Sequence, residues 1–314
     1  MGQTVADVGE FGLIELIAAR VPASSDPVGI GDDAAVLQLN GQIVTSVDTL
    51  VEGRHFKHDW SEAADIGHRA AAASLADIAA MGARPRSLLL ALAIPPDTAV
   101  SWALELVDGI MAEAEPVSAY LVGGDVCRSE AATVSVTAIG ETDRAVTRSG
   151  AQVGDVLAMA GRQGWAAAGL TVLSRGFRSP RALVSAYQRP HPPYSSGPAA
   201  AAAGATAMID ISDGLLGDVR HLAKASGVIA DLDSQEVPIS DQLVETASAF
   251  NVDPLSWVLA GGDDHALVAT FPATVNLPHM FNPIGRITDP AGQSPGVSVD
   301  GRMWNGAMGH DHFR

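Results

Sequence analysis

Residues 45–56 read Thr-Ser-Val-Asp-Thr-Leu-Val-Glu-Gly-Arg-His-Phe, an apolar run that changes into hydroxyl and carboxyl side chains. The preceding Ile43-Val44-Thr45 is typical of a β-strand, so Asp48 is expected where a strand leaves its sheet. A buried carboxylate without a partner is costly, and a bound cation offsets that cost. The stretch therefore predicts a metal site at a strand end.

The residues before this stretch predict a β-hairpin. Asn40-Gly41 separates two apolar runs, residues 34–39 and 42–47, and Asn-Gly favours a two-residue hairpin turn because both central residues need positive φ. An antiparallel hairpin would bring Asp33, at the start of one strand, near Asp48 at the end of the other. The acidic pair Asp32-Asp33 is therefore expected at the same sheet edge as Asp48.

The composition restricts the class of protein. A length of 314 residues favours two domains. The 19 Lys and Arg residues against 36 Asp and Glu give a net charge of −17, which argues against a nucleic-acid or anionic-membrane partner. One cysteine, Cys127, excludes an internal disulfide and fits a reducing compartment. No window approaches the ~18 apolar residues of a membrane span, and the N-terminus does not read as a signal peptide, so we expect a soluble, cytoplasmic protein.

The remaining pattern divides the chain into two strand-and-helix halves. In the first half we expect helices over residues 11–17, 61–81 and 95–111, and strands over 87–94, 120–122 and 133–139. Residues 142–154 hold two glycines and few large apolar side chains, which places a boundary there between domains 1–147 and 148–314. In the second half we expect strands over 156–160, 208–211, 228–232, 257–259 and 266–271, and helices over 165–173, 196–203 and 215–225.

Aspartates recur at the predicted strand ends and helix faces. They are Asp32, Asp33, Asp48, Asp77, Asp125, Asp210, Asp213, Asp263 and Asp264. Converging carboxylates raise one another's pKa unless cations lie among them, and hard oxygen ligands suit Mg²⁺, which commonly joins a few carboxylates to substrate phosphates. The pattern therefore indicates phosphate chemistry. P-loop, dinucleotide and zinc motifs are absent, so Gly-rich backbone and bound metal would have to hold any nucleotide phosphates.

Some of these residues also have a structural interpretation. An Asp beside Gly is most often part of a turn. Asp48 and Asp77 have no glycine neighbour and lie in apolar or Ala-rich elements, which favours a ligand role over a cap. His55 and Arg148 fit a structural role at least as well on composition alone. Ser74 lies three residues before Asp77 and shares its helix face.

Taken in order, the motifs resemble those of the thiamine-monophosphate kinases, in the superfamily that includes aminoimidazole ribonucleotide synthetase. They lie at residues 31–35, 47–56, 77–83, 123–125, 147–150, 189–190, 210–215, 261–264 and 311–313. The string at 48–56 and the terminal Asp311-His312-Phe313 are the narrow signals, whereas Gly-Asp-Asp and Gly-Gly-Asp occur across the superfamily. The resemblance spans nearly the whole chain.

The resemblance implies a reaction and a set of site residues. The family transfers the ATP γ-phosphoryl group to the phosphate of thiamine monophosphate, giving thiamine diphosphate and ADP in the last step of thiamine diphosphate biosynthesis. By resemblance, several Mg²⁺ ions are held by Asp32, Ser46, Asp48, Asp77, Asp125, Asp210 and Asp213. ATP contacts are Gly124, Asp125, Arg148 and Ser212, and substrate contacts are His55, Asp263 and His310. No side chain is expected to act as a general base, because the acceptor phosphate is already ionised near neutral pH.

The implied fold is α/β with mixed sheets, in two domains whose N-terminal members pair in a homodimer, with the active site in the cleft between the halves. The sequence departs from the family at some positions: Ser74 replaces an Asn, Asp263 a Glu, His265-Ala266 a Tyr-Glu pair and His310 an aromatic residue. Two alternatives stay open. One is another ATP-dependent enzyme of the superfamily, of the carbonyl-activating cyclo-ligase or hydrogenase-maturation type, and the other is a non-catalytic nucleotide-binding regulator.

Overall fold

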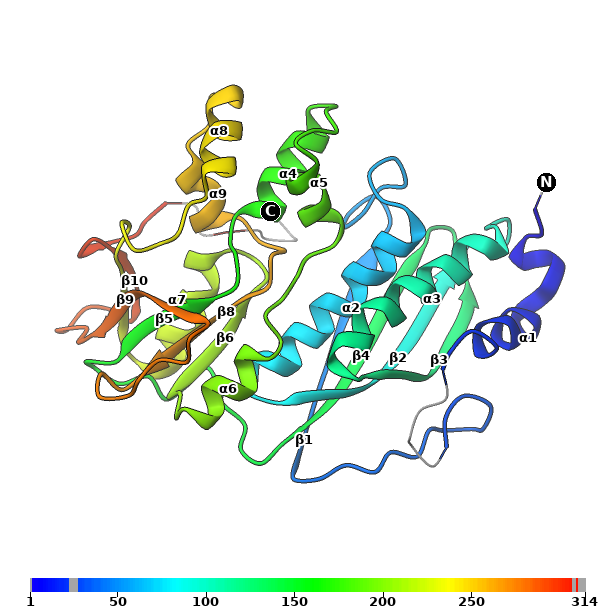
Figure 1. Cartoon of the computed structure of the whole chain (residues 1–314), viewed down its shortest axis with the longest axis horizontal. Helices are drawn as coiled ribbons and strands as arrows, with labels where there is room; N and C mark the ends of the chain where they lie inside the picture. The colour runs from blue at the N-terminus through cyan, green and yellow to red at the C-terminus, as the bar shows by residue number, and fades with distance from the viewer. Residues whose placement is uncertain (1, 23–27, 307–308, 310–314) are drawn as a thin grey trace. The chain divides into compact units, whose positions relative to one another are not determined.

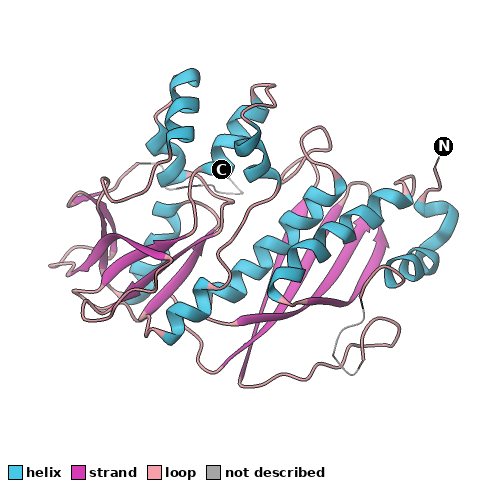
Figure 2. Cartoon of the chain, in the orientation of Figure 1, coloured by secondary structure: helices cyan, strands magenta, loops and turns pink. Residues whose placement is uncertain are grey.

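The computed structural model describes residues 2–22, 28–306 and 309, and the chain forms two compact units (Figure 1). The first unit combines Met1–Ile78 with Arg84–Asp143, and the second combines Ala79–Ala83 with Arg144–Arg314. Each unit contains one sheet with helices (Figure 2), and each sheet is mixed. The two α/β halves expected from the sequence are confirmed.

The first unit is built on a four-stranded sheet in the order β1-β4-β2-β3. Its strands are β1 Gln42–Val51, β2 Arg84–Ile94, β3 Tyr120–Arg128 and β4 Thr133–Thr142, and its helices are α1 Val5–Ala18, α2 Ala63–Ala80, α3 Val100–Ala114 and the 3-10 helix η1 Glu115–Val117. Strands β2 and β3 run parallel, and the other neighbours run antiparallel. The chain passes to the second unit after Ile78 and returns to the first at Arg84.

Helices α2 and α3 lie over one face of this sheet (Figure 1). Along β4, buried Val134, Val136 and Ala138 alternate with half-buried residues, the period of two expected of a sheet covered on one side. The two helices approach each other closely, because a Cβ on Gly67 would lie only 1.9 Å from the carbonyl oxygen of Leu106. A side chain at that position would therefore separate the helices.

The hairpin predicted around Asn40-Gly41 is wrong. Residues 34–39 form no strand, and β1 pairs instead with β4 along ten residues, from Gln42 opposite Thr142 to Val51 opposite Thr133. The backbone N–H of Asn40 donates to Glu141 Oε2 at 2.7 Å, so the turn joins the chain to β4. A long ladder with a distant strand outweighs the local turn preference.

The second unit contains a seven-stranded sheet in the order β11-β10-β7-β9-β5-β8-β6. Its strands are β5 Val156–Ala160, β6 Ala207–Ile211, β7 Ile229–Leu232, β8 Ala266–Phe271, β9 Phe281–Thr288, β10 Gly296–Val299 and β11 Arg302–Met303. Its helices are α4 Trp165–Ser174, α5 Arg181–Gln188, α6 Ser196–Ala202, α7 Leu215–Ser226, α8 Asp241–Phe250 and α9 Pro254–Ala260.

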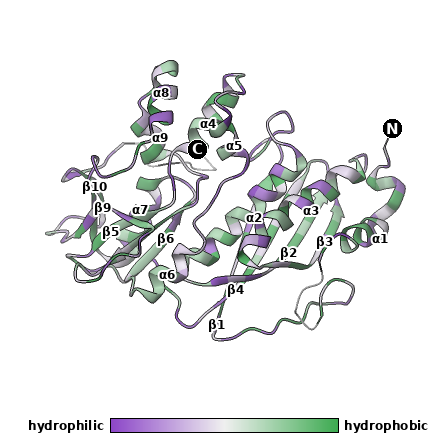
Figure 3. Ribbon diagram, viewed as in Figure 1, coloured by the Kyte–Doolittle hydropathy of each residue, from purple (hydrophilic) through white to green (hydrophobic). Residues whose placement is uncertain are grey.

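Both faces of the central strands of this sheet are covered. All six residues of β8 are buried, and its side chains alternate between two hydrophobic clusters, with Val268 in one and Leu267 and Phe271 in the other. The hydrophobic colouring of the interior strand β5 reflects the same burial (Figure 3). A strand buried on both faces reads as a continuous apolar run, which is why β5 and β8 have the bounds that the sequence predicts.

The predicted strand at residues 257–259 is wrong, because these residues belong to α9. Asp253 caps this helix, its Oδ1 accepting the N–H of Leu255 at 3.0 Å, and Pro254 occupies the first turn. Helices α5 and α8 and strands β9, β10 and β11 were not predicted. Among the residues that the structure describes, no helix is both long and apolar enough to cross a membrane.

Candidate active site

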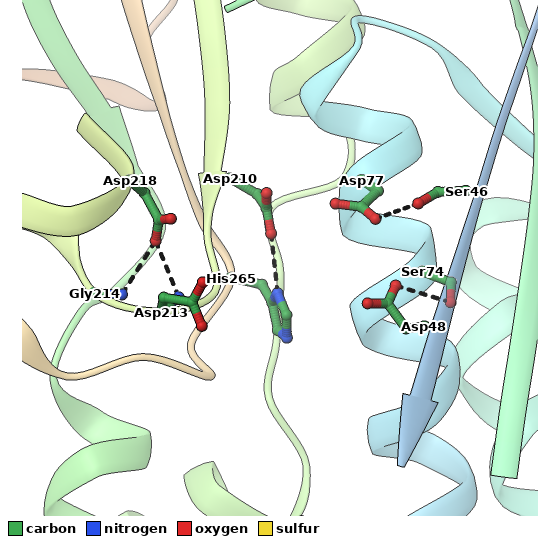
Figure 4. A network of polar contacts seen from close by, with 9 residues as sticks. All are labelled: Ser46, Asp48, Ser74, Asp77, Asp210, Asp213, Gly214, Asp218 and His265. Carbon is green, nitrogen blue, oxygen red and sulfur yellow. Dashed lines mark hydrogen bonds and ion pairs between the residues drawn. The ribbon is translucent and has the colours of Figure 1, made fainter. Parts of the chain in front are cut away.

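Two serines and two aspartates on β1 and α2 form a polar cluster in the first unit (Figure 4). The Ser46 hydroxyl donates to Asp77 Oδ2. The Ser74 hydroxyl lies 3.1 Å from Asp48 Oδ2 and 2.8 Å from the Val136 carbonyl oxygen, so its one proton is shared between two acceptors. Each aspartate is thus contacted by a serine of the other element. We call Ser46, Asp48, Ser74 and Asp77 the β1–α2 cluster.

The periods of the two elements bring these residues together. Ser46 and Asp48 are two residues apart on β1 and face the same side of the sheet, whereas Ser74 and Asp77 are three apart on one face of α2. Asp48 lies inside β1, opposite Val136, and not at the end of a strand as predicted. The reason is the β1–β4 ladder, which extends the strand to Val51.

The structure places three further predicted ligands elsewhere in the first unit. Asp32 lies in the segment before β1, and its Oδ1 accepts the N–H of Asp33 at 2.9 Å. Gly124 and Asp125 lie within β3, which continues to Arg128 beyond the Gly-Gly-Asp motif because β2 pairs with it along its length. Asp125 is exposed there.

His55 follows β1 in a turn that fixes its imidazole. Its Nδ1 accepts the N–H of Val51 at 2.9 Å, and its carbonyl oxygen accepts a hydrogen bond of 2.9 Å from Arg69. Because Nδ1 is an acceptor, the neutral ring carries its proton on Nε2. The turn therefore sets both the direction and the tautomer of His55.

A second polar cluster lies where β6 leads into α7, in the second unit (Figure 4). Asp210 Oδ2 lies 3.1 Å from His265 Nδ1, and both side chains are buried. The backbone N–H groups of Asp213 and Gly214 donate to Asp218 Oδ2 at 3.0 and 3.1 Å. We call Asp210, Ser212, Asp213, Asp218, Asp263 and His265 the β6–α7 cluster.

Backbone hydrogen bonds connect the two loops of this cluster. The N–H of Asp263 donates to the Ser212 carbonyl oxygen at 2.9 Å, and the N–H of His265 donates to the Ile211 carbonyl oxygen at 3.1 Å. Asp263 and His265 have φ values of 67° and 54°, a region that costs a non-glycine residue about 1–3 kcal/mol and is often found at active sites. The surrounding contacts hold this strained loop in place.

Two buried carboxyl groups near these loops have raised pKa values. Burial raises the pKa of Asp218 to about 7, the charges of Asp210 and Asp213 add to the rise, and the two backbone N–H groups oppose it. Burial likewise raises the pKa of Asp264 to about 7, against the N–H of Ala166 and the charge of Arg162. Asp264 is 2% exposed, and both its oxygens lie 3.1 Å from the Ala166 nitrogen, at the start of α4.

The raised pKa of Asp264 predicts how stability changes with pH. The native pKa of about 7 exceeds the ordinary 3.8, so protonation favours the native state below the lower value, and this advantage is lost as pH rises through the upper one. Relative to Asp264→Asn, the wild-type free energy of unfolding should fall between about pH 4 and 7, by roughly 4 kcal/mol at most. Denaturant unfolding across this range measures the difference, and a constant difference would contradict the prediction.

The remaining predicted site residues are less defined by contacts. Arg148 is exposed near the start of the second unit, and its carbonyl oxygen accepts the Ser226 hydroxyl at 3.1 Å. His310, a predicted substrate contact that replaces an aromatic residue of the family, lies outside the described residues.

The side-chain oxygens of the two clusters are of the type that binds Mg²⁺. The β1–α2 cluster and the β6–α7 cluster offer carboxylate and hydroxyl oxygens, the hard ligands that Mg²⁺ prefers. In the described part of the chain, no three His, Cys, Asp or Glu side chains converge closely enough to hold a metal. Mg²⁺ usually takes one or two carboxylates and completes its shell with water and substrate phosphates, so these clusters suit a metal that arrives with a nucleotide.

Comparison with known proteins identifies the family. Residues 31–142 match the N-terminal domain of AIR synthase related protein, and residues 152–296 match its C-terminal domain. The thiamine-monophosphate kinase of Mycobacterium tuberculosis is 44% identical over 315 residues, which cover 99% of this chain and 93% of that protein. The chain belongs to the thiamine-monophosphate kinase family. The resemblance seen in the sequence motifs is therefore confirmed.

Solved structures of thiamine-monophosphate kinases share the fold along nearly its whole length. The crystal structure from Stenotrophomonas maltophilia is 34% identical, with a TM-score of 0.79, over 93% of this chain and 95% of that one. AaThiL complexed with AMPPCP and TMP is 31% identical, with a TM-score of 0.81, over 99% of this chain and 100% of that one. The implied two-domain α/β fold is thus confirmed.

Three residues of the β1–α2 and β6–α7 clusters, His265, Asp218 and Ser74, were not predicted as site residues. His265 contacts Asp210, and the sequence signals were its place directly after the Gly-Gly-Asp-Asp string and its replacement of the family's tyrosine. Asp218 lies inside α7, where an acidic residue in the first turns of a helix looks like an ordinary dipole partner. The sequence predicts that Ser74 shares a helix face with Asp77 and could address the same ligand, whereas its contact with Asp48 depends on how α2 packs on β1.

Proposed function

We propose that this chain transfers the γ-phosphoryl group of ATP to the phosphate of thiamine monophosphate, giving thiamine diphosphate and ADP. The observation that carries the proposal is the full-length similarity to AaThiL complexed with AMPPCP and TMP. The 44% identity to a thiamine-monophosphate kinase supports the same reaction. Phosphoryl transfer between two polyanions needs charge neutralisation and alignment of the attacking oxygen, and carboxylate clusters that bind Mg²⁺ meet that need.

The proposed metal ligands fall in both units. In the first they are Asp32, Ser46, Asp48, Asp77 and Asp125, and in the second Asp210 and Asp213. When bound, Mg²⁺ would neutralise the phosphate oxygens and orient the transferred group. The serine contacts to Asp48 and Asp77 fix the direction of these carboxylates before the nucleotide binds, which reduces the entropy lost on binding.

The proposed nucleotide contacts are Gly124, Asp125, Arg148 and Ser212. Arg148 supplies a positive charge for a phosphate, and the backbone at Gly124 and Ser212 offers hydrogen-bonding groups without bulky side chains. No side chain is assigned as a general base, since the acceptor phosphate reacts as an anion.

The two domains would have different roles. Residues 1–147 would bind metal and ATP and form the dimer, and residues 148–314 would complete the site.

The proposed acceptor contacts are His55, Asp263 and His310. His55 is the best defined of them, because Nδ1 accepts the Val51 N–H and the neutral ring then carries its proton on Nε2, a donor of the kind that a phosphate oxygen accepts. His55→Ala should raise KM for thiamine monophosphate on the order of 10-fold, the loss of a hydrogen bond to a charged group, with KM for ATP unchanged. Steady-state kinetics with each substrate varied in turn would measure this.

His58→Ala is the matched control for His55. His58 lies three residues further on, its Nε2 is 3.1 Å from Glu52 Oε1, and its ring packs against Trp102. That variant should leave both KM values unchanged. Unchanged kinetics of His55→Ala would make His55 a structural residue.

One experiment tests the function itself. ATP consumption with Mg²⁺ is measured with thiamine monophosphate, thiamine and formylglycinamidine ribonucleotide as acceptors. Only thiamine monophosphate should be consumed, with thiamine diphosphate as the product. Turnover of the ribonucleotide would instead support a cyclo-ligase of the superfamily, and nucleotide binding without turnover would support a non-catalytic regulator.

We also propose that the first unit pairs with a second copy through the sheet face that carries Ile43 and Val47. These side chains are 63% and 61% exposed on β1, an apolar pair in a region of exposed threonines. Val47→Glu should give a monomer in sedimentation, while Val153→Glu, at a residue 59% exposed in the second unit, should remain dimeric. A wild-type monomer would refute the proposal.

We also propose that the protein is cytoplasmic, which is consistent with the exposed free thiol of Cys127.

A further inference from the structure

Asp218 is a buried carboxylate that contacts the loop before its own helix. It is 4% exposed and lies in the first turn of α7. A single oxygen, Oδ2, accepts the N–H groups of Asp213 and Gly214 at 3.0 and 3.1 Å (Figure 4). The side chain thus points back toward the loop that joins β6 to α7.

The peptide between Ser212 and Asp213 is held at both ends. Its N–H donates to Asp218, and its carbonyl oxygen accepts the N–H of Asp263 at 2.9 Å. A peptide group is planar, so two hydrogen bonds on opposite edges fix its rotation. That rotation sets the directions in which the Ser212 and Asp213 side chains leave the backbone.

We propose that Asp218 is a positioning residue, which orients Ser212 and Asp213 for the Mg²⁺–ATP complex. The inference rests on the proposed function, in which Ser212 contacts ATP and Asp213 a metal ion. The oxygen of Asp218 that accepts these bonds faces the loop amides, so the proposal assigns Asp218 no direct contact with either ligand. Small errors in the position of a ligand have large effects on phosphoryl transfer, so loss of the acceptor should reduce binding and catalysis together.

A purely structural cap is the competing explanation, and Asp155 supplies the matched control. Asp155 is also 4% exposed and lies in the second unit. Its Oδ2 accepts the N–H of Gln152 at 2.9 Å and the hydroxyl of Thr206 at 2.6 Å, in a turn before β5. Asp155→Leu and Asp218→Leu therefore remove comparable buried acceptors, but only the second lies beside the loop.

The conservative variant separates geometry from charge. Both loop N–H groups use one oxygen of Asp218, so the amide oxygen of Asp218→Asn can accept both. Asp218→Leu keeps the branched shape of the side chain, is larger, and removes the acceptor. Asp218→Ala is a smaller second variant for use if the leucine side chain prevents folding.

The test measures Mg²⁺–ATP affinity by calorimetry without acceptor, amide exchange of Asp213 and Gly214, and the Mg²⁺ concentration for half-maximal activity. In Asp218→Leu or Asp218→Ala, we expect affinity to fall about 10-fold or more and amide exchange to accelerate. Asp218→Asn should stay within about threefold of wild type. Asp155→Leu should lower Tm as much as Asp218→Leu and leave Mg²⁺–ATP affinity unchanged.

Two outcomes would overturn the inference. One is a Mg²⁺–ATP affinity in Asp218→Leu and Asp218→Ala equal to that of Asp155→Leu, which would leave only a cap. The other is an Asp218→Asn variant as impaired as Asp218→Leu, which would mean that charge matters and not loop geometry. An inactive wild type would refute the proposed function instead, while affinity and amide exchange still test Asp218.

Discussion

Asp48→Asn is expected to abolish Mg²⁺-dependent phosphoryl transfer while the fold stays intact. Asparagine keeps the shape of the side chain, and its amide oxygen can still accept the Ser74 hydroxyl that lies 3.1 Å from Asp48 Oδ2. It loses the negative charge with which Asp48 would offset the charge of Mg²⁺. We expect kcat to fall on the order of 10²–10³-fold or more, the scale seen when one electrostatic group is removed from an active site. ATP turnover over a Mg²⁺ titration measures the effect.

Asp97→Asn is the control for the loss of one negative charge. Asp97 is exposed in the segment before α3 and does not belong to the β1–α2 cluster. This variant should keep wild-type turnover. Circular dichroism and thermal melting would show that both variants fold, and near-normal activity of folded Asp48→Asn would exclude Asp48 as a metal ligand.

The structure explains which elements the sequence predicts well. Strands β5 and β8 are buried on both faces, so β5 reads as an unbroken apolar run and β8 as a run interrupted only by Thr270, and a pattern is enough to locate each. The apolar residues 257–259 are ambiguous by the same measure, because three positions cannot distinguish a strand from a helix. The deciding signal was the preceding Asp253-Pro254, a cap followed by a first-turn proline, and it lay outside the apolar segment.

The hairpin error shows the limit of local signals. Asn40-Gly41 has the turn chemistry, and Gly41 does adopt a φ of 74°. The turn is used to bring the chain beside Thr142, because β4 offers β1 a full ladder of partners from residue 133 to 142. Pairing between strands ~90 residues apart depends on tertiary packing, which no short window of sequence contains.

In the candidate site, too, local sequence predicts some features, whereas others depend on tertiary packing. The aspartates could be predicted from the sequence, since Asp48 follows an apolar strand run without a glycine neighbour and Asp77 lies three residues after Ser74 on one helix face. Their contacts could not, because the bonds from Ser74 and Ser46 depend on how far α2 slides along β1. Asp218 shows this most clearly: its role depends on a side chain turning back toward the loop before its helix.

Gly262→Ala is the second substitution with a large expected effect. A Cβ at this position would lie 2.0 Å from the carbonyl oxygen of Ser212, a distance that no real contact allows. The N–H of Asp263 bonds to that same oxygen, so the two loops cannot separate without breaking the bond. The substitution should therefore displace Ser212 and Asp213. Because a shift of ~1 Å in a reacting group can cost about 10²-fold, kcat/KM for ATP should fall by at least that factor.

Gly285→Ala supplies the comparison that makes this loss interpretable. A Cβ there would lie 2.2 Å from the carbonyl oxygen of Asp231, an equally severe collision with backbone, but in the β7–β9 pair. Both variants should therefore lose thermal stability, and only Gly262→Ala should lose activity at temperatures where both remain folded. If the two variants lose activity in equal proportion, the contact between the loops contributes through stability alone. The β6–α7 loop would then tolerate a displacement that a Mg²⁺–ATP site could not tolerate.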